Sequence, residues 1–163
     1  MLTKSQIEDV WEGQIAAETR SLYFGDLANL YTIRKQWITG LSFFLSSGAA
    51  ATLIGKLPIW FPIVLSTAVA IITAYAVAVN LDSTIRTMAK LHYAWNQMSN
   101  DYARLWSHTY EESAEEDFAD LHRRELEMSE LATTDAPNDR KRLSHWQDQV
   151  LKMIDWRAHE VVR

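Results

Sequence analysis

The sequence contains no cysteine, only three prolines and only five glycines among its 163 residues. Without cysteine, the chain cannot form a disulfide, a thiolate nucleophile or a zinc–thiolate site. The scarcity of proline and glycine argues against a turn-rich β protein and favours long helices. Four charges lie within residues 1–12, where a secretory signal would need an apolar core, so we expect no signal peptide.

Charge is almost absent from one long stretch of the sequence. Residues 36–81 contain a single charged residue, Lys56, whereas the whole chain has 16 Lys plus Arg and 21 Asp plus Glu. The net charge of −5 argues against nucleic-acid binding by the chain as a whole, though not against a local basic patch. A soluble domain spreads its apolar residues with a period of two or 3.6. This sequence instead joins an apolar block to a strongly polar remainder.

The apolar block divides into two runs that are each long enough to cross a membrane. Residues 36–55 and residues 57–81 are both uncharged, and about 20 helical residues span a hydrocarbon core of about 30 Å. The segment Gly55–Pro58 between them is typical of a tight turn. The alternative, a buried hairpin of a soluble protein, leaves too little chain to cover both helices. We therefore predict a membrane hairpin with spans over residues 36–55 and 59–80.

Basic residues near the ends of the spans predict the orientation. Arg34 and Lys35 precede the first span, and Arg86 and Lys90 follow the second. Because Lys and Arg are enriched in cytoplasmic flanks, we expect both termini in the cytoplasm. The predicted segments are an N-terminal cytoplasmic helix over residues 1–35, a transmembrane hairpin over residues 36–81, and a cytoplasmic helical stalk and helical hairpin over residues 82–163.

A helix start signal lies close to the N-terminus. Thr3 and Gln6 fit a capping box, in which the side chain of each residue accepts from the backbone N–H of the other. Gly13 and Gly25 weaken the helix that follows, so a break before residue 26 is expected. The residues after Gly25 form an apolar stripe that leads into the first span.

A heptad seam follows the second apolar run. Apolar and aromatic residues recur there at alternating spacings of four and three, the pattern of a helix that packs against a partner. Because no Pro or Gly lies between Ile63 and Ala136, the second span is predicted to continue unbroken as one helix over residues 59–109. The N-terminal helix or a neighbouring subunit must then cover the seam. Its positions are Leu81, Ile85, Met88, His92, Trp95, Ser99, Tyr102 and Trp106.

The C-terminal third carries further helical signals. Residues 111–120 hold six acids and no base, which is typical of a solvated helix face, with a hinge or a cation-attracting ring as alternatives. A turn is predicted over residues 133–138, and Asn138 or Asp139 should cap a last helix. The helices on either side should pair as an antiparallel hairpin. No segment alternates with the period of a strand, so the predicted fold is all-α and, because of the seam, oligomeric.

The sequence contains no recognisable catalytic or metal-binding motif. It has neither a glycine-rich phosphate loop nor an HExxH motif, and its five histidines lack the spacing of a metal site. His92 lies on the heptad seam, where we expect a packed or hydrogen-bonded histidine. The chain is therefore expected to be no enzyme and to need no cofactor or metal.

Polar residues within the second run suggest a pore. Ser66, Thr73 and Asn80 are seven residues apart and therefore share one face of a helix. Hydroxyls and small residues also pack helices together in a bilayer, so helix packing and oligomer contacts are one interpretation. In the other interpretation these three residues line a conduit, which needs several copies because two helices cannot enclose a pore.

A basic cluster with aromatic neighbours lies at the start of the last helix. Basic groups, a helix N-terminus and an aromatic face commonly hold phosphates and bases, so the cluster is a candidate ligand-binding site. Two more arginines could join it across the helical hairpin. A charged surface paired with nearby acids, with Trp146 in the core, is the alternative. The candidate residues are Arg140, Lys141, Arg142, His145, Trp146, Arg123 and Arg124.

The layout resembles a bacterial family, the SLATT proteins, which are two-transmembrane effectors of antiphage defence. The resemblance covers residues 20–110 and is carried by Tyr23, Tyr31, Arg34, Lys35, Lys90, His92, Trp95 and Tyr102. The chain is also similar to the membrane effector of Hailong-type systems, in which the messenger holds the channel closed. The resemblance implies a pore-forming effector that responds to a nucleotide or oligonucleotide made by a partner nucleotidyltransferase.

Together, the residues and the resemblance lead us to expect a homo-oligomeric ion channel of the bacterial inner membrane that depolarises the membrane during phage infection. Its partners would be the lipid bilayer, further copies of the chain and a nucleotide or single-stranded oligonucleotide, but not duplex nucleic acid. The alternative is a non-conducting, membrane-anchored helical adaptor that recruits a cytoplasmic partner. Exposure of the seam on a monomer would favour the adaptor, and its burial between identical subunits would favour the channel.

Overall fold

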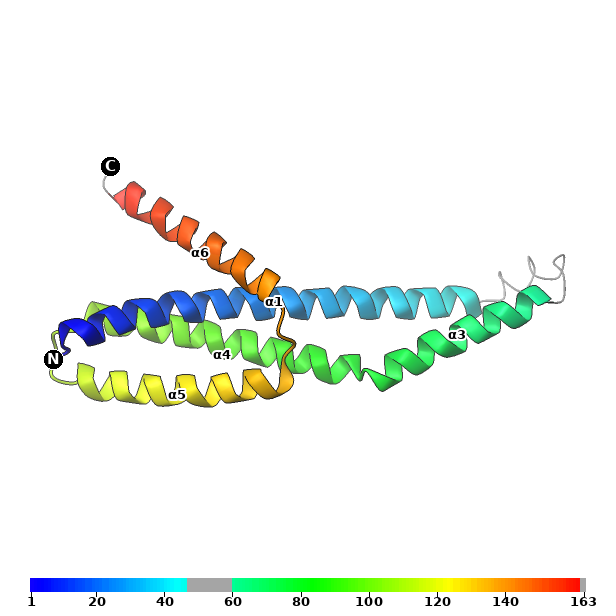
Figure 1. The fold of residues 1–163 in the computed structure, drawn as a ribbon, viewed down its shortest axis with the longest axis horizontal. Helices are drawn as coiled ribbons and strands as arrows, with labels where there is room; N and C mark the ends of the chain where they lie inside the picture. Colours follow the sequence, from blue (N-terminus) through cyan, green and yellow to red (C-terminus); the bar gives the residue numbers. More distant parts are fainter. Residues whose placement is uncertain (47–59, 162–163) are drawn as a thin grey trace. The chain divides into compact units, whose positions relative to one another are not determined.

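A computed structural model describes residues 1–46 and 60–161 of the chain. Every regular element in these two ranges is an α-helix, which confirms the predicted all-α class (Figure 1). The predicted turn at Gly55–Pro58 and part of the predicted first span lie outside the described residues. The helices are α1 (Lys4–Ser46), α3 (Trp60–Ala78), α4 (Leu81–Ser107), α5 (Ala114–Asp135) and α6 (Arg140–Val161).

The chain divides into two compact units. One comprises Met1–Leu27 and Thr87–Arg163 and is called the polar unit below. The other comprises Ala28–Arg86 and is called the apolar unit. The basic cluster of the sequence lies in the polar unit, and the three candidate pore residues lie in the apolar unit, so each candidate site belongs to one unit alone.

The N-terminus of α1 has the predicted capping box. The Gln6 backbone N–H donates to Thr3 Oγ1 (3.3 Å), and the Thr3 backbone N–H donates to Gln6 Oε1 (2.8 Å). Two of the N–H groups that a helix start leaves without an intrahelical partner are satisfied in this way. The local sequence therefore predicted the beginning of α1 correctly.

The break expected before residue 26 is wrong, because α1 continues through both glycines. The glycines lie where α4 approaches α1 closely. A Cβ atom at Gly13 would come within 2.6 Å of the Tyr102 ring, and one at Gly25 would come within 3.0 Å of His92 Nδ1. His92 Nδ1 in turn donates to the Ser21 carbonyl oxygen (2.8 Å), so this seam histidine is hydrogen-bonded as predicted. The glycines thus serve helix packing and not helix termination.

The core of the polar unit forms where α4 faces α1 and α5, which run beside it (Figure 1). The seam residues Met88, Trp95 and Tyr102 are buried, whereas Trp106 is 44% exposed. A second row of α4, formed by Leu91 and its i+7 neighbours, is buried as well, so the apolar face is wider than a coiled-coil seam. Helices of the same chain therefore cover the seam. The buried residues of this second row are Leu91, Met98 and Leu105.

The second apolar run does not continue as one helix, so that prediction is wrong. α3 ends at Ala78, and α4 begins at Leu81. Between them Asn80 has a φ of 44°, in the left-handed region. Asparagine adopts this conformation more readily than most residues because its short polar side chain can hydrogen-bond locally. A single asparagine therefore breaks the helix, without the glycine or proline that a break was expected to need.

The left-handed conformation of Asn80 leads to a test of the break. We expect Asn80→Val to lower the free energy of unfolding by about 1–2 kcal/mol, since a β-branched residue is strained at positive φ. Asn80→Gly should change it by less than about 0.5 kcal/mol, because glycine has no Cβ to clash. Thermal unfolding of the detergent-solubilised protein, followed by circular dichroism at 222 nm, measures both. Asn96→Val, at an exposed helical position of α4, is the matched control; an equal loss in both valine variants would contradict the assignment.

The last helix begins where the sequence predicts, but it does not pair with α5 along its length. The Arg142 backbone N–H donates to Asp139 Oδ1 (3.2 Å), so Asp139 caps α6 as expected. Figure 1 shows α6 running back in the direction opposite to α5 but inclined to it, so the expected pairing of the two helices along their length is wrong. An ion pair between Arg142 and Asp26 of α1 (2.6 Å) attaches the start of α6 to α1.

Candidate functional site

The first candidate site is the surface of α3, which is predominantly apolar. Ile63, Ile71 and Val77 are all exposed on it. Among the described residues, one candidate membrane span is long and apolar enough to cross a bilayer. It lies within Ser66–Ser107, and its apolar window has a mean hydropathy of 1.6 and is only 6% buried. A core helix of a soluble protein can have the same composition but would be covered by its neighbours. The apolar side chains of α3 are thus available to lipid or to another helix.

Two of the three predicted pore residues share a face of α3, and the third does not belong to that helix. Ser66 and Thr73 are seven residues apart within α3, and both are exposed. Asn80 lies in the break after α3, so its side chain is not part of the same helical row. The seven-residue spacing assumed one unbroken helix, and the left-handed residue interrupts it.

An ion pair lies beside the apolar surface of this unit. Lys35 Nζ lies 2.5 Å from Asp82 Oδ1, which joins α1 to the first turn of α4. The hydrogen bond from Lys35, followed by its charge, lowers the pKa of the Asp82 carboxyl. Lys35 immediately precedes the predicted first span, and Asp82 follows the predicted second span. The pair therefore joins residues that flank the two apolar runs.

The second candidate site is the basic cluster at the start of α6, of which Arg142 is engaged within the protein. Arg142 contacts Asp26 (2.6 Å) and Asp139 (3.4 Å), and the hydrogen bond to Asp26 is the main reason why its pKa is raised. Trp146 Nε1 donates to the same Asp26 carboxylate (3.4 Å). Tyr23 fastens the preceding turn to α1 through its hydroxyl, which donates to the Pro137 carbonyl oxygen (2.5 Å). These contacts attach α6 to α1.

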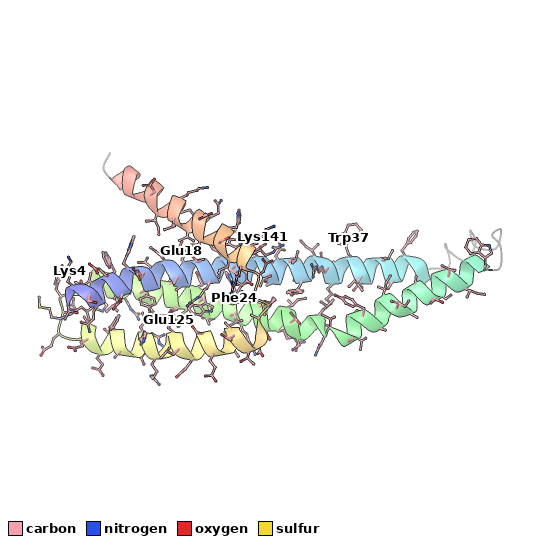
Figure 2. The ribbon with its side chains drawn as sticks, viewed as in Figure 1. Lys4, Glu18, Phe24, Trp37, Glu125 and Lys141 are labelled. Atoms are coloured by element: carbon pink, nitrogen blue, oxygen red, sulfur yellow. The ribbon has the colours of Figure 1, made fainter. Side chains whose placement is uncertain are left out.

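Arg140 and Lys141 are the accessible cations of the cluster. Both are exposed, and within residues 1–46 and 60–161 neither forms an ion pair (Figure 2 labels Lys141 at the start of α6). The exposed ring of His145 lies edge-on to Trp146, with centroids 5.6 Å apart. Two free cations beside a helix N-terminus and an aromatic pair can attract an anion.

Arg123 and Arg124 do not join this cluster. Arg123 contacts Asp120 (2.6 Å) on its own helix, and Arg124 contacts Asp101 of α4 (2.9 Å). Asp101 precedes Tyr102, which packs against Gly13 of α1, whereas Arg142 contacts Asp26 of α1. At a rise of 1.5 Å per residue, Gly13 and Asp26 are about 20 Å apart along that helix. The expected contribution across the helical hairpin fails because carboxylates of α5 and α4 already engage both arginines.

A polar network in the core was missed by the sequence reasoning. Glu125 of α5 accepts from Arg20 of α1 (3.0 Å) and from the Tyr102 hydroxyl of α4 (2.8 Å). Burial, followed by the bond to Glu125, raises the pKa of Tyr102 well above its usual range, so the phenol stays protonated and donates. The Arg20 guanidinium also lies 4.5 Å from the centre of the Trp95 ring. No local sequence pattern predicts this network, because Arg20 and Glu125 are 105 positions apart in the chain.

The described part of the chain contains no group of three or more His, Cys, Asp or Glu side chains that could hold a metal ion. The chain matches no protein-family model, no curated protein and no solved structure.

Proposed function

We propose that this protein is an integral membrane protein of the bacterial inner membrane whose copies assemble into an ion-conducting pore. The observation that carries the proposal is the exposed, apolar surface of α3, of which Ile71 and Val77 are examples. Such a surface is stable in lipid and costly in water. The Lys35–Asp82 ion pair supports an antiparallel hairpin, since it joins the residues that flank the two apolar runs.

Polar groups on α3 support conduction over simple anchoring. Ser66 and Thr73 lie on one exposed face of α3, a predominantly apolar helix. A hydroxyl facing lipid tails contributes nothing favourable, whereas a hydroxyl facing a neighbouring helix or water does. Several copies that turn this face inward would place Ser66 and Thr73 along a conduit.

We further propose that the polar unit senses a nucleotide or a single-stranded oligonucleotide. Support comes from Arg140 and Lys141 at the start of α6, which form no ion pair with any residue that the structure describes, and from the aromatic pair beside them. The resemblance to SLATT-type effectors of antiphage defence agrees with this role, and a partner nucleotidyltransferase would make the messenger. Duplex nucleic acid is not a proposed ligand.

A second candidate function is a non-conducting, membrane-anchored adaptor. The observation that favours it is the burial of the α4 seam by helices of the same chain, including Trp95 and Tyr102. Burial inside one chain removes the seam as an argument for oligomers. The exposed apolar surface of α3 then serves only to hold the polar unit at the membrane.

Ion flux from liposomes that contain the purified protein distinguishes the two functions. We expect flux from the wild type and a reduction on the order of tenfold in Thr73→Val, which removes a polar group from the conduit at nearly constant volume. Asn80→Gly keeps the left-handed backbone and removes the whole side chain, so it tests Asn80 without strain. Thr67→Val is the matched control, because the Thr67 hydroxyl already donates to the Ile63 carbonyl oxygen (2.9 Å).

The same liposomes test the ligand. Nucleotides and short single-stranded oligonucleotides are added to the wild type and to Arg140→Gln/Lys141→Gln, which removes both unpaired cations and leaves Arg142 in place. We expect a ligand to switch the flux of the wild type only. No flux from protein shown to be inserted and oligomeric would reject the pore and support the adaptor.

A further inference from the structure

A cavity of about 830 Å³ lies in the polar unit among α1, α5 and α6. Ile15 of α1, Phe118 of α5, and Leu143 and Leu151 of α6 give it apolar walls. Its volume is in the range that accommodates drug-sized organic molecules. None of the residues proposed above to bind a nucleotide lines it. It is therefore a separate candidate site.

The charges along the cavity favour a cation. Asp9, Glu12 and Glu125 contribute three carboxylates, whereas Arg20 contributes a single guanidinium. Arg20 is already engaged by Glu125 (3.0 Å; Glu125 is labelled in Figure 2) and by the Trp95 ring. Asp9 and Glu12 are exposed, and within the described part of the chain neither forms an ion pair. Two carboxylates thus remain available to a ligand.

Two further observations point to an organic ligand. Thr19 lines the cavity and is only 5% exposed, yet its hydroxyl oxygen has no hydrogen-bond partner among the described residues. Buried hydroxyls nearly always have a partner, so the Thr19 hydroxyl is an unsatisfied polar group in the wall of the cavity. Phe118 and His122, which both line the cavity, form a stacked pair with centroids 6.4 Å apart. Aromatic rings beside carboxylates attract alkylammonium groups through cation–π contacts.

We propose that this cavity binds a small organic cation, an alkyl- or arylammonium compound. Its apolar body packs on Leu143 and Leu151, and its charge lies near Asp9, Glu12 and the Phe118 ring. A nucleotide is the wrong ligand here, because its phosphates would face the carboxylates. Binding occurs within the polar unit and does not depend on conduction by the apolar unit.

Isothermal titration calorimetry on the full-length protein in lipid nanodiscs tests the proposal, with benzyltriethylammonium chloride as the probe and empty nanodiscs as the blank. We expect saturable binding of one molecule per chain. We also expect Asp9→Asn/Glu12→Gln to weaken the affinity at least about tenfold, since both available carboxylates are lost. Both residues are exposed, so the far-UV circular dichroism of this variant should match the wild type.

A second double variant, Glu112→Gln/Glu130→Gln, removes the same charge from exposed positions outside the cavity and should bind like the wild type. An equal loss in both double variants would show a general charge effect and overturn the site. Absence of saturable binding to the wild type would overturn it as well. Phenyl phosphate also carries one aromatic ring but is an anion, and it should not bind. Tighter binding of phenyl phosphate than of the ammonium probe would overturn the proposed ligand class.

Discussion

Replacing Trp95 by alanine is expected to lower the free energy of unfolding by about 3–5 kcal/mol, the range for a buried tryptophan. Trp95 is fully buried on α4, in the core that α4 forms with α1 and α5. Its ring also faces the Arg20 guanidinium at 4.5 Å. Removing the ring leaves a cavity in this core and takes away the aromatic surface that covers a partly buried charge.

Chemical denaturation of the detergent-solubilised protein, followed by circular dichroism at 222 nm, measures this loss. Trp106→Ala is the matched control on the same helix, because Trp106 is 44% exposed and its main aromatic contact is Trp11 at 5.6 Å. We expect Trp106→Ala to cost less than about 1.5 kcal/mol. If the two alanine variants lose similar stability, the burial of the α4 seam within one chain is wrong.

The second large effect is expected for Gly13→Ala, which should lower the free energy of unfolding although this change usually raises it in a helix. Glycine to alanine in a helix interior ordinarily stabilises by about 1 kcal/mol. At Gly13 the new methyl group would come within 2.6 Å of the Tyr102 ring, which is 2% exposed and is held by Glu125 through a hydrogen bond of 2.8 Å. Overpacking and loss of that bond outweigh the gain in helix propensity, so we expect a net loss of about 2 kcal/mol.

A double-mutant cycle isolates this contact. When Tyr102 is alanine, the same Gly13→Ala change should stabilise by about 0.5–1 kcal/mol, because the obstacle is gone and only the propensity gain remains. Gly40→Ala is the control on the same helix, since nothing lies within 4 Å of its added methyl group. A loss at Gly13 that persists without the tyrosine ring would disprove the close approach of α4.

Local patterns predicted the helices well, because short-range chemistry determines where they begin. The capping box at Thr3 and the cap at Asp139 are both found, since each involves residues only three positions apart. Gly13 and Asn80 misled the reasoning for opposite reasons. Gly13 accommodates a ring 89 positions away in the chain, and Asn80 breaks a helix through a backbone conformation that composition alone does not reveal.

The candidate site was only partly predictable, because charges recognise partners that lie far away in sequence. Arg142 looks like its neighbours in the basic cluster, yet it pairs with Asp26 at a separation of 116 positions. Arg140 and Lys141 have the same charge but no such partner in the described structure. The core network around Glu125 arises in the same way. Sequence reasoning found which residues are charged, and the packing of α6 on α1 determines which of them remain available.

Both boundaries between the two units fall inside helices, at Leu27/Ala28 of α1 and at Arg86/Thr87 of α4. Domain boundaries usually fall in exposed linkers, where the chain can be cut or extended without loss. A cut at either position here would leave backbone N–H and carbonyl groups of an interrupted helix without partners. The chain is therefore not modular: neither unit can be exchanged or expressed alone without severing two helices.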